Sequence, residues 1–456
     1  MKKLLLFAAF LVVFSSQAQN DFWTEYPTSQ PAASTGMRSI SIVDDNVAWL
    51  SNSCGTTGCV AIRRYSKSVN GGTVWTTGVV DLGANSANLE IANICGTSAD
   101  VAYASVFPKV TGAVGGVYKT INGGTTWTRQ NTAVFNGADG ASFCNLVHFF
   151  NANEGVTMGD PSGGSFEIYT TTNGGTNWTR IAGLPAAIDE EEYGLTNKFT
   201  AKGNTVWIGT TFGRILKTTD KGATWTVTQS PIPDFGGGIN GDGTGDLAFT
   251  DQNNGLLQTG DYLLYGTADG GTTWNEVLWD ANLRNFAISD IPGLPNTYIT
   301  LGEDLDNTER GSSYTTNGGV NWVNINNNPD AEFVQGGVIA FLNPNTGFAS
   351  GFSTSAAVGG IYKWNADHDP FLANTSFSSD KAFTATPNPT SGNLNIAGKN
   401  ISNVAVYDIL GKQVSNDNFS ALSNATINMS ALNSGVYMVK VTSTTGASST
   451  IKVVRN

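Results

Sequence analysis

Residues 120–127, Thr120-Ile-Asn-Gly-Gly-Thr-Thr-Trp127, form a motif that recurs along most of the chain. Each copy reads Ser/Thr-x-Asn/Asp-x-Gly-x-x-Trp, and the other copies occupy residues 68–75, 171–178, 218–225, 267–274 and 315–322. Successive motif tryptophans are 52, 51, 47, 49 and 48 residues apart. A repeat of this length is typical of propellers and solenoids.

The chemistry of the motif predicts a closed hairpin turn. Asn or Asp can bond its own backbone and tolerates a left-handed conformation, and the glycine that follows adopts positive φ without steric cost. The Ser/Thr hydroxyl can bond within the turn, and the Trp can pack its apolar face on neighbouring strands. We therefore interpret the motif as a structural corner rather than as a catalytic or metal site.

The motif resembles the Asp-box of bacterial neuraminidase repeats, which is found in sialidases, sortilin-type receptors and photosystem II assembly factors. Only two copies keep the acidic residue of that family. The motif positions are Asn70, Asn122, Asn173, Asp220, Asp269 and Asn317. The resemblance implies blades of a β-propeller, with the boxes away from the functional face, and the frequent Asn supports a role in the turn.

The segments between the boxes predict seven four-stranded blades. A strand, a short polar turn and a second strand rich in small residues recur seven times, for example in residues 149–160 and 247–261. The seventh copy ends at Gly360–Trp364 with no box after it, whereas Phe22–Glu25 resembles the strand that follows each box. We therefore expect an all-β, seven-bladed propeller that the N-terminal strand closes, which also removes exposed sheet edges.

Composition agrees with an exported all-β protein. The chain has 456 residues, 54 of them glycine and only 13% charged. Met1-Lys-Lys, the apolar run 4–14 and Ser16-Gln17-Ala18 predict a signal peptide, residues 1–18. Residues 19–380 hold 34 acidic and 16 basic residues, which argues against nucleic acid as a partner. We expect a monomer without a transmembrane segment in its mature form.

The repeat pattern stops after Trp364. We predict a propeller over residues 19–366, a linker over 367–380, and a small immunoglobulin-like antiparallel β-sandwich over 381–456. The last segment contains Pro387-Asn-Pro389, then residues 404–412 and 432–440 with alternating apolar positions, and ends Ile451-Lys-Val-Val454. It resembles the C-terminal sorting domain of the type IX secretion system of Bacteroidetes. This resemblance implies passage through the outer membrane by that machinery, removal of the domain, and secretion or attachment at the cell surface.

The cysteines and one glycine-rich loop offer few metal ligands. Cys54 and Cys59 flank a short loop and are candidates for a disulfide, whereas pairing of Cys95 with Cys144 is left open. Residues 240–246, Asn-Gly-Asp-Gly-Thr-Gly-Asp, alternate oxygen ligands as a calcium loop does but lack the distal bidentate Glu. We expect no cofactor and no metal, with calcium at this loop as the alternative.

Candidate site residues follow from the position of the boxes. If the boxes join the third and fourth strands, the loops after each second strand and before each first strand gather on the opposite face. There we expect the candidate catalytic carboxylates Asp160, Glu192 and Asp261. The candidate binding residues are Tyr193, Tyr262, Glu303, Asp304, Arg38 and Arg284.

Three functions fit this pattern. The first is a binding module that holds a glycan or a protein partner on the face opposite the boxes, which requires no catalytic group. The second is a glycoside hydrolase, sialidase-like or other, that uses two of the candidate carboxylates as acid and base or nucleophile. The third is a purely structural or assembly role. A sialidase is the weaker form of the second, because no Arg-Ile-Pro signature and no clear Tyr–Glu pair occur.

Overall fold

The structure is a computed structural model, and it describes residues 22–55, 63–83, 86–110, 112–135, 143–236, 245–280, 282–306, 309–327, 337–366, 383–409, 411–444 and 448–456. The chain divides into two compact units, Met1–Asp369 and Pro370–Asn456. The predicted signal peptide and the predicted linker lie outside the described residues. Apart from the short 3-10 helix η1 (Ser86–Asn88), every described element is a β-strand.

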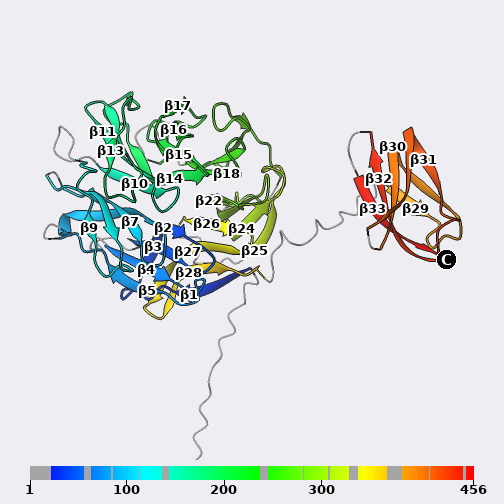
Figure 1. The fold of residues 1–456 in the computed structure, drawn as a ribbon, viewed down its shortest axis with the longest axis horizontal. Coiled ribbons are helices and arrows are strands. Elements are labelled where there is room, and N and C mark those ends of the chain that lie inside the picture. Colours follow the sequence, from blue (N-terminus) through cyan, green and yellow to red (C-terminus); the bar gives the residue numbers. More distant parts are fainter. Residues whose placement is uncertain are drawn as a thin grey trace, which may run out of the picture. The chain divides into compact units, whose positions relative to one another are not determined.

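The first unit consists of antiparallel sheets arranged around a common centre (Figure 1). Five sheets have four strands each, in sequence order from the inside outward. They are β6 (Leu89–Gly96), β7 (Ala102–Pro108), β8 (Gly116–Thr120) and β9 (Thr128–Arg129); β10 (Cys144–Phe149), β11 (Gly155–Ser162), β12 (Ser165–Thr171) and β13 (Thr179–Arg180); β14 (Gly194–Lys202), β15 (Thr205–Thr210), β16 (Arg214–Thr218) and β17 (Thr226–Gln229); β18 (Gly245–Phe249), β19 (Gly255–Thr259), β20 (Leu264–Thr267) and β21 (Asn275–Glu276); and β22 (Asn285–Asp290), β23 (Tyr298–Glu303), β24 (Arg310–Thr315) and β25 (Val323–Asn327).

The remaining sheet of this unit has eight strands and contains both ends of the repeat array. Its two halves meet at a single residue pair, Gly36 with Phe352. The strands are β2 (Thr35–Ile42), β3 (Ala48–Cys54), β4 (Arg64–Ser68) and β5 (Thr76–Val79) in one half, and β26 (Ile339–Asn343), β27 (Thr346–Ser355), β28 (Val358–Trp364) and β1 (Trp23–Pro27) in the other.

The N-terminal strand pairs with the last strand of this unit, as the sequence predicts. In β1, Trp23 lies opposite Trp364 and Pro27 lies opposite Gly360. The Trp23 and Trp364 rings meet edge to face with centroids 5.0 Å apart. Residues 23–27 therefore supply the outermost strand of the half-sheet that begins with β26.

All six boxes form the same closed turn. In each, the Ser/Thr hydroxyl donates to the Asn/Asp Oδ1 over 2.8–3.1 Å. The same hydroxyl accepts the backbone N–H of the glycine four residues on, over 2.8–3.1 Å. The boxes connect third strands to fourth strands, for example β8 to β9, so they share one face, which we call the box face.

The core of the first unit lies between neighbouring sheets. Trp207 of β15 and Phe249 of β18 stack with centroids 3.9 Å apart, inside a cluster that also holds Ile215, Phe235 and Leu257.

The second unit is one five-stranded antiparallel sheet system with its own core. Its strands are β29 (Phe383–Thr386), β30 (Asn393–Asp408), β31 (Gln413–Asn428), β32 (Gly435–Ser443) and β33 (Ser448–Arg455). Strand β30 is long enough to pair with three partners, β29, β31 and β32. Among the described residues, no helix is long and apolar enough to span a membrane.

Candidate functional site

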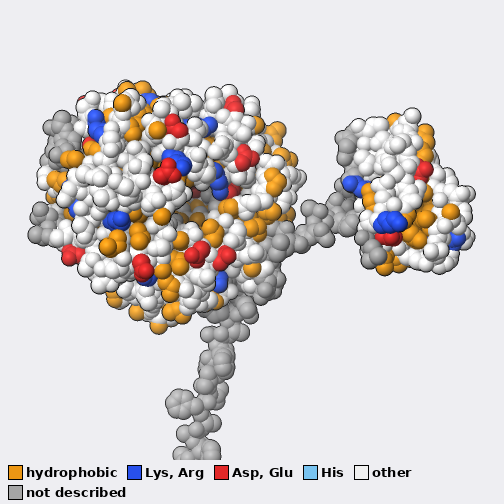
Figure 2. Space-filling model, viewed as in Figure 1, with side chains coloured by type: hydrophobic (Ala, Val, Ile, Leu, Met, Phe, Trp, Pro, Cys, Tyr) orange, Lys and Arg blue, Asp and Glu red, His pale blue; other side chains and the backbone are white. Residues whose placement is uncertain are grey.

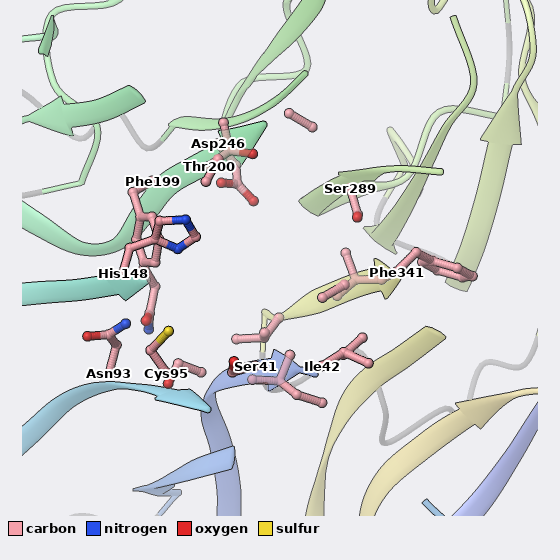
Figure 3. Close-up of a pocket in the computed structure, with 18 of the residues that line it drawn as sticks. Ser41, Ile42, Asn93, Cys95, His148, Phe199, Thr200, Asp246, Ser289 and Phe341 are labelled. Atoms are coloured by element: carbon pink, nitrogen blue, oxygen red, sulfur yellow. The ribbon is translucent and has the colours of Figure 1, made fainter. Parts of the chain in front are cut away.

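The innermost strands of the first unit surround a central channel. Side chains from β2, β6, β10, β14, β18, β22 and β26, the innermost strands, line a cavity of about 330 Å³. Figure 3 shows His148, Asp246, Ser289 and Ser41 around it, each from a different strand. A second cavity of about 570 Å³ adjoins it, lined by the first residues of several of these strands and by the ends of β3 and β19.

The second cavity opens at the end of the channel opposite the boxes, and we call it the channel mouth. Inner strands begin at this end, and the turns from second to third strands, such as β19 to β20, lie here as well. We call this side of the molecule the mouth face. The space-filling view shows a central hollow in the first unit (Figure 2).

A bulge in β14 brings two polar residues to the channel mouth. The register between β14 and β15 shifts between Gly194 and Phe199, and within this interval Asn197 has a φ of 66°. Bulges re-aim side chains, and non-glycine residues in the left-handed region cluster at functional sites. Asn197 and Lys198 both line the mouth as a result.

Amide groups form a second feature of the mouth. Gln258, at 2% exposure, donates from Nε2 to the backbone oxygen of Arg284 at 2.8 Å and to Asn285 Oδ1. Asn285 in turn donates from Nδ2 to the Gly260 oxygen at 2.9 Å. These contacts hold the end of β19 against the start of β22.

The charged groups of the channel are paired or partly neutralised. Arg38 forms an ion pair with Glu90, and Lys202 forms one with Asp290. Asp246 accepts the backbone N–H of Ile288 at 3.2 Å; burial raises its pKa, which the Lys198 charge and this bond partly counteract. The charges of the channel therefore largely cancel.

His148 is a neutral imidazole in the channel wall. Its ring packs edge to face on Phe150, with centroids 4.9 Å apart. Burial lowers the pKa of His148 to about 4, because the charged form would lose its hydration. At neutral pH it therefore contributes hydrogen-bonding capacity but no charge.

Asp160 lies at the far end of β11, on the mouth face. Its Oδ1 accepts Asn145 Nδ2 at 2.8 Å. Burial raises the pKa of Asp160 to about 7, against the opposing effect of hydrogen bonds from Asn145 and the Gly194 backbone. Tyr193 lies nearby. Burial raises the pKa of its hydroxyl, and the negative charge of Asp160 raises it further.

Glu192 is fully buried. Its carboxylate accepts from the Ile188 backbone N–H at 2.9 Å, from the Thr210 hydroxyl at 2.9 Å and from Arg214 at 2.8 Å. All these donors belong to the same loop or to β15 and β16. The arrangement ties the loop before β14 to the neighbouring turn, and the carboxylate is held within the protein.

The other candidates gather on the turns of β19–β20 and β23–β24. Asp261 is exposed and accepts the Thr259 hydroxyl. Tyr262, with φ 66°, donates its hydroxyl to the Asp304 backbone oxygen at 2.7 Å. Arg284 is buried and pairs with Glu309 at 2.9 Å and, more weakly, with Asp304 at 3.8 Å.

The candidate residues therefore form two separate groups. Asp160, Glu192 and Tyr193 surround the β11 end and the loop before β14, whereas Asp261, Tyr262, Glu303, Asp304 and Arg284 surround the turns of the next two sheets. Arg38 alone of the candidates lines the channel mouth.

Sequence reasoning missed most of the mouth. The overlooked residues are Asn197, Lys198, Gln258, Asn285 and Phe286. A partial signal was present, because innermost strands begin at this end of the channel and polar residues such as Asp246 and Asn285 stand at their first or second position. Arg38 was chosen from that signal, but the bulge that brings Asn197 to the same end cannot be read from residue spacing.

The structure bears on the predictions about the cysteines and about metal ligands. Cys54 is disulfide-bonded, and its expected partner Cys59 lies outside the described residues. Cys95 and Cys144 are buried free thiols, and burial raises their pKa values to about 11 and about 12. Among the described residues there is no group of acidic, His and Cys side chains able to hold a metal. Most of the 240–246 loop lies outside them.

Two known families match parts of the chain. Residues 385–456 match the secretion system C-terminal sorting domain. Residues 84–231 match the photosynthesis system II assembly factor YCF48 family. The chain is an Asp-box β-propeller with a type IX secretion sorting domain. The sorting domain indicates export by that system, to the cell surface or into the medium. No curated protein matches the chain.

Several solved structures resemble the chain at low identity. YCF48 bound to D1 peptide has a TM-score of 0.48 and 13% identity, and the match covers 76% of this chain and 98% of that one. A GH74 enzyme of Niastella koreensis has a TM-score of 0.44 and 13% identity over 92% and 66%. A protein of unknown function from Dyadobacter fermentans has a TM-score of 0.39 and 12% identity over 76% and 99%. These likenesses do not distinguish a binding protein from a glycoside hydrolase.

Proposed function

We propose that the propeller is an exported binding module whose mouth face takes a polypeptide partner rich in basic and apolar side chains. One observation carries the proposal: three loops on this face, which belong to three successive sheets, each present an exposed aliphatic side chain beside carboxylates. The aliphatic residues are Ile188, Leu263 and Leu305, which are 63%, 37% and 61% exposed.

Acidic residues flank each of these aliphatic side chains in sequence. Asp189–Glu191 follow Ile188, Asp261 precedes Leu263 by two positions, and Asp304 and Asp306 enclose Leu305. Exposed aliphatic groups that recur on one face mark interaction surfaces. Carboxylates around them favour a partner of opposite charge, because complementary potentials steer association and suppress wrong partners.

The arginines of this face do not cancel that charge. Arg214 pairs with Glu192, Arg284 with Glu309 and Arg310 with Glu303. Each of these guanidinium groups pairs with a carboxylate of the same or a nearby loop, whereas the carboxylates at 189–191, 261 and 306 form no ion pair with another described residue. An acidic ligand would meet repulsion here, whereas lysine and arginine side chains would find unpaired carboxylates.

A peptide display experiment tests the proposal. The mature protein is panned against a library of random 12-residue peptides, and enriched peptides are measured by fluorescence polarisation. We expect lysine or arginine next to leucine, isoleucine or phenylalanine. The combined variant Ile188→Ser, Leu263→Ser, Leu305→Ser should weaken binding by about tenfold or more, which corresponds to about 1.4 kcal/mol.

The matched control changes exposed aliphatic residues on the box face. Val69 and Ile121 are 56% and 69% exposed, and their replacement by Ser should leave peptide affinity unchanged. Enrichment of acidic peptides, or equal affinity of the triple variant and the wild type, would contradict the proposal.

A glycoside hydrolase is the second candidate function. The observation in its favour is the pKa of Asp160, raised to about 7 by burial, which suits a general acid at neutral pH. Glu192 is a poor second carboxylate, since Arg214 and two other donors already occupy it. Incubation with a panel of chromogenic aryl glycosides decides the matter: turnover that Asp160→Asn abolishes supports this candidate, and a panel without turnover removes it.

We further propose seven blades, by counting the eight-stranded sheet as two blades that touch at Gly36 and Phe352. In the exported form, residues 1–18 and the sorting domain at 381–456 are removed, which leaves the propeller at 19–366 with its linker at the cell surface or in the medium. The intact mass of the exported protein tests these boundaries; a mass that includes residues 381–456 would contradict removal.

A further inference from the structure

We propose that the channel mouth is a binding site for an uncharged sugar, distinct from the polypeptide surface on the surrounding loops. The geometry that points to it is the meeting of Gln258, Asn197 and Phe286 at one cavity of about 570 Å³. That volume falls in the range of about 300–1,000 Å³ typical of small-ligand pockets. The inference does not depend on the polypeptide partner.

Two acceptors at the mouth have no donor from the described part of the chain. Gln258 Oε1 and Asn197 Oδ1 are both buried, and neither accepts a hydrogen bond from a described residue. The Gln258 amide cannot simply rotate to relieve this, because its Nε2 already donates to the Arg284 oxygen and to Asn285. Buried polar atoms of folded proteins almost always have partners, so a ligand that donates hydrogen bonds fits here.

The mouth also offers a donor. Arg38 Nε is buried and has no acceptor among the described residues, although the same guanidinium pairs with Glu90 through its terminal nitrogen. A ligand at this site must therefore both donate and accept. A hydroxyl group does both, and a sugar ring presents several hydroxyls at fixed spacing.

The charge balance selects an uncharged ligand. Arg38 is matched by Glu90, and Lys198 stands close enough to Asp246 to influence its ionisation. The charges of Arg38, Glu90, Lys198 and Asp246 sum to zero, so neither a phosphate nor an ammonium group would find a net countercharge among these residues. Amides and paired ions are groups that hydroxyls can bond without bringing a new charge into a buried site.

Phe286 supplies an apolar surface at the rim. It follows Asn285 at the start of β22 and is 55% exposed, which is unusual for a phenylalanine in an innermost strand. A sugar ring has one face of C–H groups and a periphery of hydroxyls. The exposed phenylalanine can pack on the C–H face of the sugar, and the amides can bond to its hydroxyls.

Asn197 presents its amide to the mouth from a left-handed backbone. Its φ of 66° lies in a region that asparagine adopts more readily than most other non-glycine residues. Glycine would adopt this conformation freely, yet the side chain is an amide that faces the same cavity as Gln258.

Calorimetric titration of the mature protein tests the inference, with cellobiose, lactose, maltose and N,N′-diacetylchitobiose as probes and a glycan array as the wider screen. We expect at least one of these sugars to bind. Phe286→Ala should weaken that binding by roughly 2- to 10-fold, and Gln258→Met by about tenfold. Gln229→Met, an exposed amide on β17, is the matched control and should bind as the wild type does.

Thermal unfolding of each variant separates loss of the site from loss of the fold, and Phe286, being exposed, is the safer change. The inference is overturned if no sugar binds in either assay, or if Phe286→Ala and Gln258→Met both bind like the wild type. The triple variant Ile188→Ser, Leu263→Ser, Leu305→Ser should keep sugar binding, so failure of the polypeptide proposal and failure of this one give different results.

Discussion

At the scale of single residues, the three candidate carboxylates have entirely different surroundings. Glu192 is fully buried and bonded to three donors, including Arg214. Asp261 is exposed. Asp160 is buried and accepts hydrogen bonds from Asn145 and the Gly194 backbone. These bonds do not offset the loss of hydration, so the pKa of Asp160 is raised. Sequence position placed all three on one face, but burial and partners decide what each can do.

Asp160 should make stability depend on pH. Its pKa rises from 3.8 to about 7 on folding, so the folded state binds the proton more tightly than the unfolded state does. Its stabilising contribution is complete below pH 4 and is lost as pH rises through 7, at a cost of at most about 4 kcal/mol. Asp160→Asn should therefore raise the thermal unfolding midpoint at pH 8 and change it little at pH 4.

The control for this prediction is Asp261→Asn, on an exposed carboxylate of the same face, which should change the midpoint little at either pH. An Asp160→Asn variant that is destabilised equally at pH 4 and pH 8 would show that the charge of Asp160 is not the source of the effect.

At the scale of elements, the boxes explain why Asn and Asp are interchangeable. Asp220 accepts the Thr224 hydroxyl with its second oxygen, at 2.6 Å. In the box at Asn122, the side-chain Nδ2 instead donates to the Thr126 hydroxyl, at 2.8 Å. A hydroxyl can reverse its role, so both versions close the same turn.

This leads to a prediction for the fourth box. Asp220→Asn should change the free energy of unfolding by less than about 0.5 kcal/mol. Thr218→Val should cost about 1–3 kcal/mol, because the Gly222 N–H, which bonds to the Thr218 hydroxyl at 2.8 Å, becomes a buried donor without a partner. Denaturant unfolding measures both. If Asp220→Asn were the more harmful change, the carboxylate would have a role beyond the turn.

The boxes also join one sheet to the next. Lys67 of β4 donates to the Gly123 oxygen of the following box at 3.1 Å, and Lys119 of β8 donates to the Gly174 oxygen at 2.6 Å. Each lysine lies over an aromatic ring of its own sheet, Trp49 or Tyr103. The turn that each box closes therefore also positions a carbonyl for the neighbouring sheet.

At the scale of the whole molecule, the array of sheets depends on a contact between its two ends. Strand β1 pairs with β28 along five residues, and Trp23 also donates to the Ser312 hydroxyl at 3.0 Å. Trp23 is 2% exposed and packs on Trp364 and Phe341. One side chain thus holds three distant segments together.

Trp23→Ala should consequently be among the more damaging changes. Loss of a buried aromatic side chain costs about 3–5 kcal/mol, and here it also weakens the pairing that removes a free sheet edge. Thr24→Ala, at an exposed position of the same strand, is the control and should cost about 0.5 kcal/mol or less. Thermal unfolding with size-exclusion chromatography tests this; similar midpoints for the two variants would contradict a closing role for β1.

The all-β class, the turns and the sorting domain were within reach of the sequence. Residues 120–127 define a turn through residues only two to four positions apart, and the resemblance of 381–456 rests on motifs within one short segment. The channel mouth was not within reach. Asn197 reaches it through a bulge in β14, and Gln258 meets Asn285 from a different sheet.

The sequence by itself determined the repeat, because each box is closed by hydrogen bonds between neighbours in the chain, such as Thr120 to Asn122 and Gly124. Only the tertiary structure decided which polar groups are satisfied. Arg284, just before β22, pairs with Glu309 of the β23–β24 connection, whereas Gln258 Oε1 and Asn197 Oδ1 meet no donor among the described residues. The reason is physical: local bonds depend on residue order, but burial and long-range partners depend on how the sheets pack around the channel.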